Sequence, residues 1–90
     1  MSLEIMAKGI VVVKEKEVIE KMKKHGFEMV EKGGNKYKVW LYAKYHPYKL
    51  FELLSATYGY LEFRGEDDSY WKWKIENGII KEYAGKIVYE

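Results

Sequence analysis

The sequence has no cysteine, no glutamine and only one proline. Without cysteine the chain forms no disulfide, no thiolate metal site and no cysteine nucleophile, so its stability must come from packing and charge. No run of residues approaches the ~18 to 20 apolar residues of a membrane-spanning helix, and the N-terminus lacks the pattern of a signal peptide. We therefore expect a cytoplasmic protein with no membrane partner.

Glutamine, which is thermally labile, is missing from a chain that has fifteen lysines and twelve glutamates. This usage is typical of thermophilic proteins, which favour lysine and glutamate and avoid labile side chains. The 16 basic and 14 acidic side chains nearly cancel, so the formal net charge is only +2. Such a small charge neither requires nor excludes a polyanionic partner, and only a local cluster would argue for one.

Motifs of catalysis and cofactor binding are missing as well. The chain has no glycine-rich phosphate loop, no nucleophile elbow and no HExxH pattern. We therefore expect no cofactor and no catalytic residue. Enzyme activity stays open only because a dimer cleft can bring together histidines and carboxylates that lie far apart in the sequence.

The few side chains that suggest chemistry each have a structural interpretation that we prefer. His25 falls at the end of a predicted helix, where a positive charge stabilises the helix dipole. His46 precedes Pro47 and is placed to cap a second helix or to end a strand. The acidic run from Glu66 to Asp68 lacks the spacing of a calcium loop, so we interpret it as a solvated turn and expect no metal.

Ninety residues, of which 48% are hydrophobic, predict one folded domain that spans residues 1–90. Residues 1–8 give no readable pattern, so we expect them to be disordered or partly foreign to the natural chain, with Met6 as an alternative start. The rest of the chain predicts the order βαββαβ followed by a C-terminal β-hairpin. The expected strands are Gly9–Val13, Phe27–Lys32, Lys36–Tyr45, Tyr60–Arg64, Ser69–Glu76 and Ile79–Tyr89, and the expected helices are Glu15–His25 and the segment from Pro47 to Gly59.

This order of elements predicts an α+β fold. Two split β-α-β units place both helices on one face of a two-layer antiparallel sheet, in the ferredoxin-like order. The β-branched run from Ile10 to Val13 suits a central strand that is covered on both faces. Gly26 is expected to end the first helix in a left-handed conformation, with Phe27 folding back onto Met22. Gly85 is expected to form a bulge in the last strand.

The first hairpin turn leaves a choice of register. A three-residue loop over Gly33–Asn35 sets Met29 opposite Val39 and Lys32 opposite Lys36. A two-residue loop would instead face Met29 with a lysine. We expect the three-residue loop, because it keeps the core side chains together at the expense of a weak lysine pair.

The second hairpin turn, Asn77-Gly78, leaves a similar choice. A tight two-residue turn places Lys74 opposite Lys81, whereas a bulged turn places Lys72 opposite Glu82. We expect the bulged turn, because it replaces repulsion between two lysines with attraction between opposite charges.

Alternation along the strands predicts two different faces of the sheet. The core side of Lys36–Tyr45 carries Tyr37, Val39, Leu41, Ala43 and Tyr45, and that of the final hairpin carries Trp71, Trp73 and Ile75. The opposite side, away from the helices, should normally be polar. Here its aromatic and basic side chains predict an interaction face made of Lys38, Trp40, Tyr42, Lys44, Tyr70, Lys72 and Lys74.

The order of elements from Gly9 to Arg64 resembles that of the RNA-recognition-motif family. The third strand of that family exposes aromatic side chains two residues apart, as Trp40 and Tyr42 would be here. The family also has glycines in this strand, which Lys36–Tyr42 lacks, and an exposed aromatic residue in its first strand, where this chain has only aliphatic residues. The resemblance implies RNA binding on the open face of the sheet.

Two functions of different class follow from this face. We favour a non-catalytic module of unknown specific role that forms a homodimer, because the aromatic face is continuous with the apolar run from Ile10 to Val13 and is too large to leave in water. The alternative is sequence-nonspecific binding of single-stranded nucleic acid, in which aromatic rings stack on bases and lysines contact phosphates. The low net charge and the glutamates near this face favour the homodimer.

Overall fold

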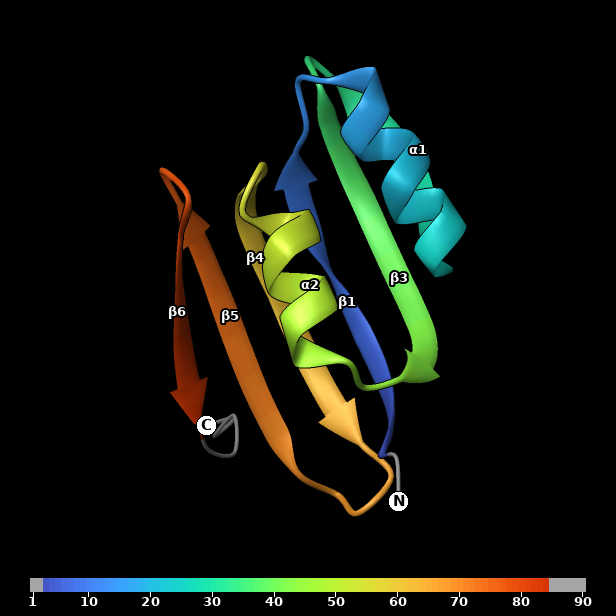
Figure 1. Ribbon diagram of the computed structural model, residues 1–90, viewed down its shortest axis with the longest axis vertical. Coiled ribbons are helices and arrows are strands. Elements are labelled where there is room, and N and C mark those ends of the chain that lie inside the picture. Colours follow the sequence, from blue (N-terminus) through green and yellow to red (C-terminus); the bar gives the residue numbers. More distant parts are fainter. Residues whose placement is uncertain (1–2, 85–90) are drawn as a thin grey trace.

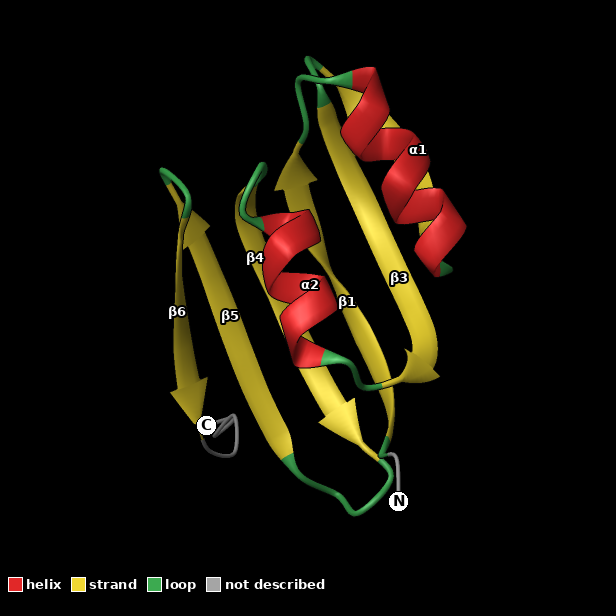
Figure 2. Cartoon of the chain, viewed as in Figure 1, coloured by secondary structure: helices red, strands yellow, loops and turns green. Residues whose placement is uncertain are grey.

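Six strands and two helices make up most of residues 3–84, the part of the chain that the computed structural model describes (Figure 1, Figure 2). In chain order the elements are β1 (Glu4–Val12), α1 (Lys16–His25), β2 (Glu28–Gly33), β3 (Lys36–Lys44), α2 (Pro47–Leu54), β4 (Tyr58–Gly65), β5 (Tyr70–Glu76) and β6 (Ile79–Ala84). The strands form one sheet in the order β2-β3-β1-β4-β5-β6, and every neighbouring pair is antiparallel.

Both helices lie on the same face of this sheet (Figure 1). The predicted α+β class, the antiparallel sheet and the order of the elements are therefore confirmed. The ferredoxin-like order is not confirmed, because the sheet has six strands and continues through β5 and β6 beyond β4.

Strand β1 begins earlier than the sequence suggested. Its inward side chains include Ile5 and Ala7, each 1% exposed, while Met6 and Lys8 are exposed on the other face. The prediction that residues 1–8 are disordered is therefore wrong from residue 4 onward. A small inward alanine alternates with an apolar outward methionine, so neither face stands out in the sequence. The strand is central, between β3 and β4, but only its inward face is covered by helices.

Helix α1 ends as its sequence predicts. Gly26 has a φ of 116°, and its N–H donates to the carbonyl oxygen of Lys23 at 3.1 Å. The N–H of Phe27 donates to the carbonyl oxygen of Met22 at 3.0 Å, which folds the chain back over the last turn. Phe27 and Met22 are both buried, so the same turn closes the helix and fills the core.

Helix α2 is shorter than expected. It ends at Leu54, whose carbonyl oxygen accepts hydrogen bonds from the N–H and the hydroxyl of Thr57 at 2.9 and 2.8 Å. This turn leads directly into β4, so Gly59 lies within that strand and does not close the helix. His46 is the N-cap residue, but its side chain makes no capping hydrogen bond. The capping role suggested for His46 is therefore absent.

The β2–β3 hairpin has the predicted core register. Met29 is opposite Val39, as expected. Near the turn, however, Gly33 rather than Lys32 is opposite Lys36, which leaves Lys32 in a bulge, so the predicted three-residue loop is wrong. The bulge keeps two lysines out of direct cross-strand pairing, where they would repel each other.

The Asn77-Gly78 turn is tight, and the predicted bulge is wrong. Its two residues have φ angles of 50° and 76°, as a two-residue hairpin turn requires. Lys74 therefore lies opposite Lys81, and Lys72 is not opposite Glu82. Both lysines of the pair are solvent-exposed, where repulsion between them is weak, so the favourable turn decides the register.

Trp73 anchors the C-terminal hairpin in the core. Of the three residues of β5 predicted to be buried, Trp73 and Ile75 are fully buried and Trp71 is half-buried. The Nε1 of Trp73 donates to Glu82 Oε1 at 2.8 Å, a bond that only the tight turn allows by placing these two residues opposite each other. The ring of Phe51, on α2, stacks on Trp73 with centroids 4.4 Å apart. This stack joins the hairpin to the helix layer.

Strand β6 ends the described part of the chain at Ala84. Its outward residues Ile79 and Tyr83 are 61% and 51% exposed, so the strand widens the uncovered side of the sheet. The predicted continuation to Tyr89 and the predicted bulge at Gly85 lie outside the described residues.

Two glycines let β1 and β4 approach closely at the centre of the sheet. A Cβ at Gly9 would overlap the carbonyl oxygen of Tyr60 and lie 2.9 Å from the Cα of Leu61. In the same way, a Cβ at Gly59 would overlap the carbonyl oxygen of Ile10. Because these obstructing atoms belong to the backbone, no side-chain rotation relieves the overlap, and only glycine fits at either position.

We expect the Gly9→Ala substitution to lower the free energy of unfolding by about 3 kcal/mol or more, because β1 and β4 must move apart. A matched control is Gly34→Ala, where φ is +57° and nothing lies within 4 Å of the added Cβ. The control should cost only about 1 kcal/mol of backbone strain. Urea unfolding of the two variants measures the difference, and equal stabilities would contradict the close approach.

Candidate functional site

The face of the sheet opposite the helices, called the outer face below, is covered by no element of residues 3–84 (Figure 1). By strand register its basic residues are Lys8, Lys36, Lys38, Lys44, Arg64, Lys72, Lys74 and Lys81, and its acidic residues are Glu4, Glu28, Glu62 and Glu76. Basic side chains thus outnumber acidic ones two to one here, although the formal net charge of the whole chain is only +2. Positive charge is concentrated on this face.

Aromatic side chains are interspersed among these charges. The outer face carries Trp40, Tyr42, Tyr58, Tyr60, Tyr70 and Tyr83. Eight large hydrophobic side chains are exposed in the described chain, and six of them lie on this face: Met6, Val30, Tyr42, Tyr58, Ile79 and Tyr83. The other two, Tyr48 and Phe51, belong to α2. The outer face is therefore both the most basic and the most apolar of the exposed surfaces.

The register arranges these side chains in rows that cross the sheet. One row alternates in charge and runs Glu28, Trp40, Lys8, Glu62, Lys72, Tyr83. The neighbouring row has no carboxylate and runs Val30, Lys38, Ile10, Tyr60, Lys74, Lys81. With strands ~4.8 Å apart, a row spans roughly 24 Å. The second row is a basic track that includes the ring of Tyr60 and passes beside the ring of Trp40.

Three basic groups that belong to the outer face lie over its aromatic rings. The distances from cation to ring centroid are 5.2 Å for Lys38 over Trp40, 4.9 Å for Lys72 over Tyr60 and 5.5 Å for Arg64 over Tyr70. Contacts of this kind at exposed sites contribute about 0.5 to 1 kcal/mol each. They hold the cations beside the rings in the free protein and are weak enough to be exchanged for a ligand.

Most of the basic groups on the outer face have no carboxylate partner. Within residues 3–84 the ion pairs are Arg64 with Asp68 at 3.7 Å and Lys74 with Glu76 at 3.5 Å. All four side chains are more than half exposed, so these pairs contribute little to stability. The other lysines of this face make no ion pair with the described residues, so their charges are not neutralised there.

The seven residues that the sequence suggested as an interaction face all point to the outer face. From β3 come Lys38, Trp40, Tyr42 and Lys44, and from β5 come Tyr70, Lys72 and Lys74. Strands β3 and β5 are not neighbours, because β1 and β4 lie between them. Sequence reasoning missed the bridging residues Lys8, Tyr60 and Arg64, although alternation along the predicted strand from Tyr60 to Arg64 contained the signal for two of them.

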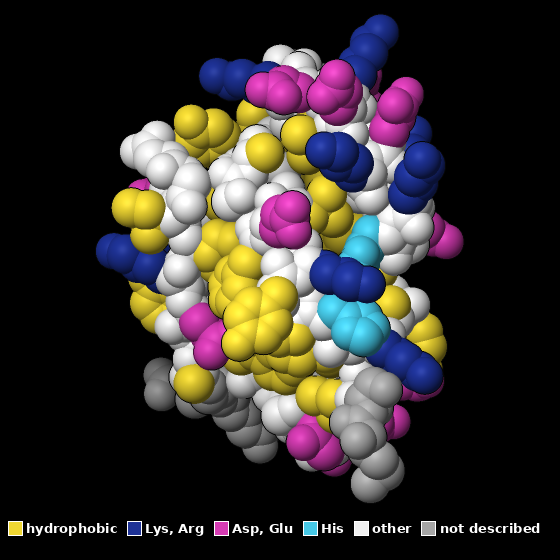
Figure 3. Space-filling model, viewed as in Figure 1, with side chains coloured by type: hydrophobic (Ala, Val, Ile, Leu, Met, Phe, Trp, Pro, Cys, Tyr) yellow, Lys and Arg dark blue, Asp and Glu magenta, His cyan; other side chains and the backbone are white. Residues whose placement is uncertain are grey.

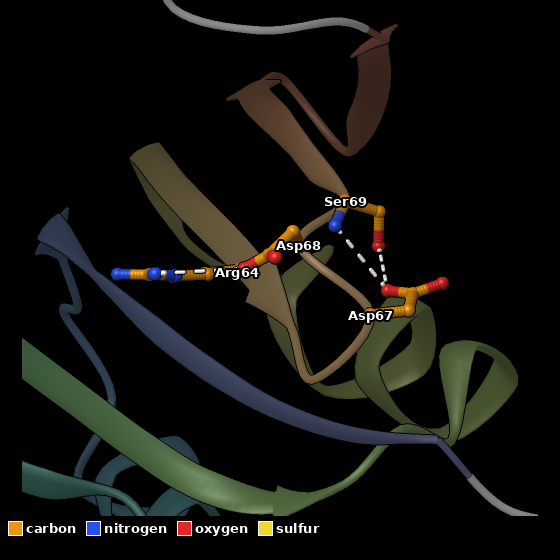
Figure 4. A network of polar contacts seen from close by, with 4 residues as sticks. All are labelled: Arg64, Asp67, Asp68 and Ser69. Atoms are coloured by element: carbon orange, nitrogen blue, oxygen red, sulfur yellow. Dashed lines mark hydrogen bonds and ion pairs between the residues drawn. The ribbon is translucent and has the colours of Figure 1, made fainter.

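The acidic turn after β4 is held by local hydrogen bonds. Asp67 Oδ1 accepts from the hydroxyl and, at 3.3 Å, from the backbone N–H of Ser69, while Asp68 pairs with Arg64 (Figure 4). These bonds to Ser69 lower the pKa of Asp67. The carboxylates point to separate partners, and no group of three histidine, aspartate or glutamate side chains in the described part of the chain is arranged to hold a metal ion.

The two histidines lie close together on the helix side, which the sequence did not indicate. Figure 3 shows both of them, in cyan, beside a basic side chain. Burial lowers the pKa of His25, and the nearby positive charges of His46 and Lys49 lower it further. Because protonation of His25 is disfavoured, the predicted role of His25 as a positive charge at the helix end is not supported.

The chain matches no protein-family model, no curated protein and no solved structure. The likeness to the RNA-recognition-motif family therefore rests only on the order of elements and on the aromatic pair Trp40 and Tyr42. Neither helix in residues 3–84 is long and apolar enough to cross a membrane. Function must be argued from the chemistry of the outer face.

Trp40 allows the positive potential of the outer face to be measured. Trp40 is the one tryptophan of the outer face and is half-buried, as Trp71 is on the helix side, whereas Trp73 is fully buried. The fluorescence of Trp40 is the part of the signal that Trp40→Phe removes. We expect iodide to quench this fluorescence more strongly than caesium, because a positive surface attracts the anion and repels the cation. The difference should disappear in Trp40→Phe. Equal quenching of the unmodified protein by the two ions at constant ionic strength would contradict a positive outer face.

Proposed function

We propose that the outer face binds single-stranded nucleic acid without sequence preference. The observation that carries this proposal is the excess of basic over acidic side chains on one face of a chain whose formal net charge is only +2. A local cluster of lysines attracts a polyanion by releasing its counterions, and this does not require a high overall charge. The placement of charge supports nucleic acid over the homodimer that the sequence alone favoured.

The outer face has aromatic rings that can contact the base of a nucleotide and lysines that can contact its phosphate. Every base has a π face, so Trp40 and Tyr60 can stack on bases without distinguishing their sequence. The ammonium groups of Lys38 and Lys72 already lie about 5 Å from these two rings. When a base stacks on the face of the ring, it displaces the ammonium group, which then pairs with the adjoining phosphate. One weak cation–π contact is thereby exchanged for a stacked base and an ion pair.

A single strand suits this face better than a duplex. Bases reach a protein ring only when they are unpaired and splayed out. The rings of Trp40 and Tyr60 belong to strands on either side of β1, so successive bases can be received across the open sheet. The row that contains Lys38, Lys74 and Lys81 then follows the phosphates.

We also infer that β2-β3-β1-β4 with the two helices form a ferredoxin-like unit. Each helix connects two strands that flank a third: α1 links β1 to β2 around β3, and α2 links β3 to β4 around β1. The hairpin of β5 and β6 extends this unit and contributes Lys72, Lys74 and Lys81 to the outer face.

The double substitution Trp40→Ala and Tyr60→Ala tests the stacking. We expect it to weaken binding of a fluorescent oligonucleotide of about 12 nucleotides by at least about tenfold, because each stacked ring contributes ~1 to 3 kcal/mol. Tyr48→Ala is a matched control, since this ring is 86% exposed on α2 at the helix side. The control should bind normally in a fluorescence anisotropy titration.

The salt dependence of the same titration tests the phosphate contacts. Binding should weaken as salt rises, and Lys38→Gln should reduce the slope of log K against log salt by about 0.7. Binding that ignores salt, or that survives loss of both rings, would contradict the proposal.

Self-association through the outer face is the second candidate. It is favoured by the observation that six of the eight exposed large hydrophobic side chains lie there. Two copies of a face with excess positive charge would repel each other, however, and lysine is depleted in the cores of protein interfaces. A dimer through this face should therefore strengthen as salt rises, whereas nucleic-acid binding should weaken.

Light scattering after size exclusion separates the two candidates. We expect a monomer mass at low micromolar protein in about 0.1 M salt, because the charges of two outer faces are only partly screened there. The control is Tyr42→Lys, which replaces a ring that is 72% exposed on the outer face. A stable dimer that this substitution dissociates would favour self-association and contradict nucleic-acid binding as the main role of the face.

A further inference from the structure

A cleft of about 280 Å³ lies between α1 and α2, on the opposite side of the sheet from the outer face. It is lined by Val18, Lys21 and His25 of α1, by Lys49, Glu52 and Leu53 of α2, and by Ala56. Its volume lies just below the range of about 300 to 1,000 Å³ for small-molecule sites, so only a small ligand fits. The lining combines basic groups with a few apolar side chains, so both parts of a small charged ligand have contacts there.

Lysine and histidine side chains converge on this cleft from both helices. Lys21 and His25 lie one turn apart on α1 and face Lys49 on α2, and His46 immediately precedes α2. Glu52 is the one carboxylate of the lining, and no ion pair in residues 3–84 joins it to these basic groups. Within the described part of the chain, the basic groups of the cleft therefore make no ion pair with a carboxylate.

The effect of this charge reaches the imidazole of His25. Burial is the main cause of its lowered pKa, and the positive charges of His46 and Lys49 add to the effect. A divalent metal cation would be repelled by the same groups. A bound anion would have the opposite effect on the pKa of His25, because its negative charge stabilises the imidazolium. It would also accept hydrogen bonds from the lysines.

We propose that the cleft between α1 and α2 binds a phosphate group, either as inorganic phosphate or as the phosphomonoester of a small organic molecule. A phosphate anion has enough charge and acceptor oxygens to engage Lys21, His25 and Lys49 together. Val18 and Leu53 offer an apolar wall to the organic part of a monoester. The site is independent of the outer face, because the sheet separates the two.

Nuclear magnetic resonance of the histidine ring protons tests this site on the whole chain at about pH 6, where histidine is partly protonated. Inorganic phosphate is titrated at constant ionic strength against chloride. We expect a saturable shift of the His25 resonance and a rise in the pKa of His25. Lys49→Gln should weaken phosphate binding about threefold to fivefold, as loss of one exposed charge pair does. Lys23→Gln, an exposed lysine of α1 outside the cleft, should have no effect.

Glycerol phosphate, titrated in the same way, distinguishes the two sources of the phosphate group. Tighter binding of the ester supports a phosphomonoester, and equal binding supports inorganic phosphate. Shifts that do not saturate, that chloride reproduces, or that Lys23→Gln and Lys49→Gln change equally would overturn the site. The Trp40→Ala and Tyr60→Ala variant should still bind phosphate, so failure of nucleic-acid binding and failure of this site are told apart.

Discussion

The two-residue alternation of the strands is the constraint on which the rest of the structure depends. Inward positions of the central strands hold small or apolar side chains, such as Ile5, Ala7 and Val11, and the two helices cover them. Nothing in the described chain covers the outward positions, so their composition is free of packing demands. A protein that needed only solubility would fill them with mixed polar residues. Here aromatic rings and lysines occupy them instead, which is why the outer face requires an explanation beyond stability.

How far the sequence predicts this fold depends on how strictly apolar and polar residues alternate along each strand. Strand β3 was predicted almost to the residue, because its inward Val39 and Leu41 contrast with flanking lysines. The first part of strand β1, before Gly9, was missed, because Ala7 is too small to mark an inward face and Met6 is too apolar to mark an outward one. The predicted register of the last hairpin was wrong for another reason. The geometry of the turn and the hydrogen bond from Trp73 outweighed the repulsion between two lysines. Neither of these two contributions can be read from the pattern of charges in the sequence.

The candidate site was predicted only in part, because a face is a property of strand order as well as of alternation. The sequence assigned the outward residues of β3 and β5 correctly in direction but did not place β1 and β4 between those strands. Lys8 and Arg64 therefore went unnoticed, and with them the excess of basic charge. The overall charge of +2 concealed this asymmetry, since it averages the outer face with the helix side. For the same reason the approach of His25 to His46 could not be foreseen, because it depends on how the helices lie across the sheet.

The core and the outer face are linked through single residues of β5. Trp73 is fixed on the inward side by its stack with Phe51 and its bond to Glu82. Because neighbours in a strand point to opposite faces, that fixation also directs Lys72 and Lys74 outward. A slip of one residue would bury two lysines and expose the indole, at a cost of several kcal/mol, so the register is strongly specified. The aromatic core beneath the sheet thus determines where the positive charges stand above it, and the basic track on the outer face is a consequence of how the last hairpin packs.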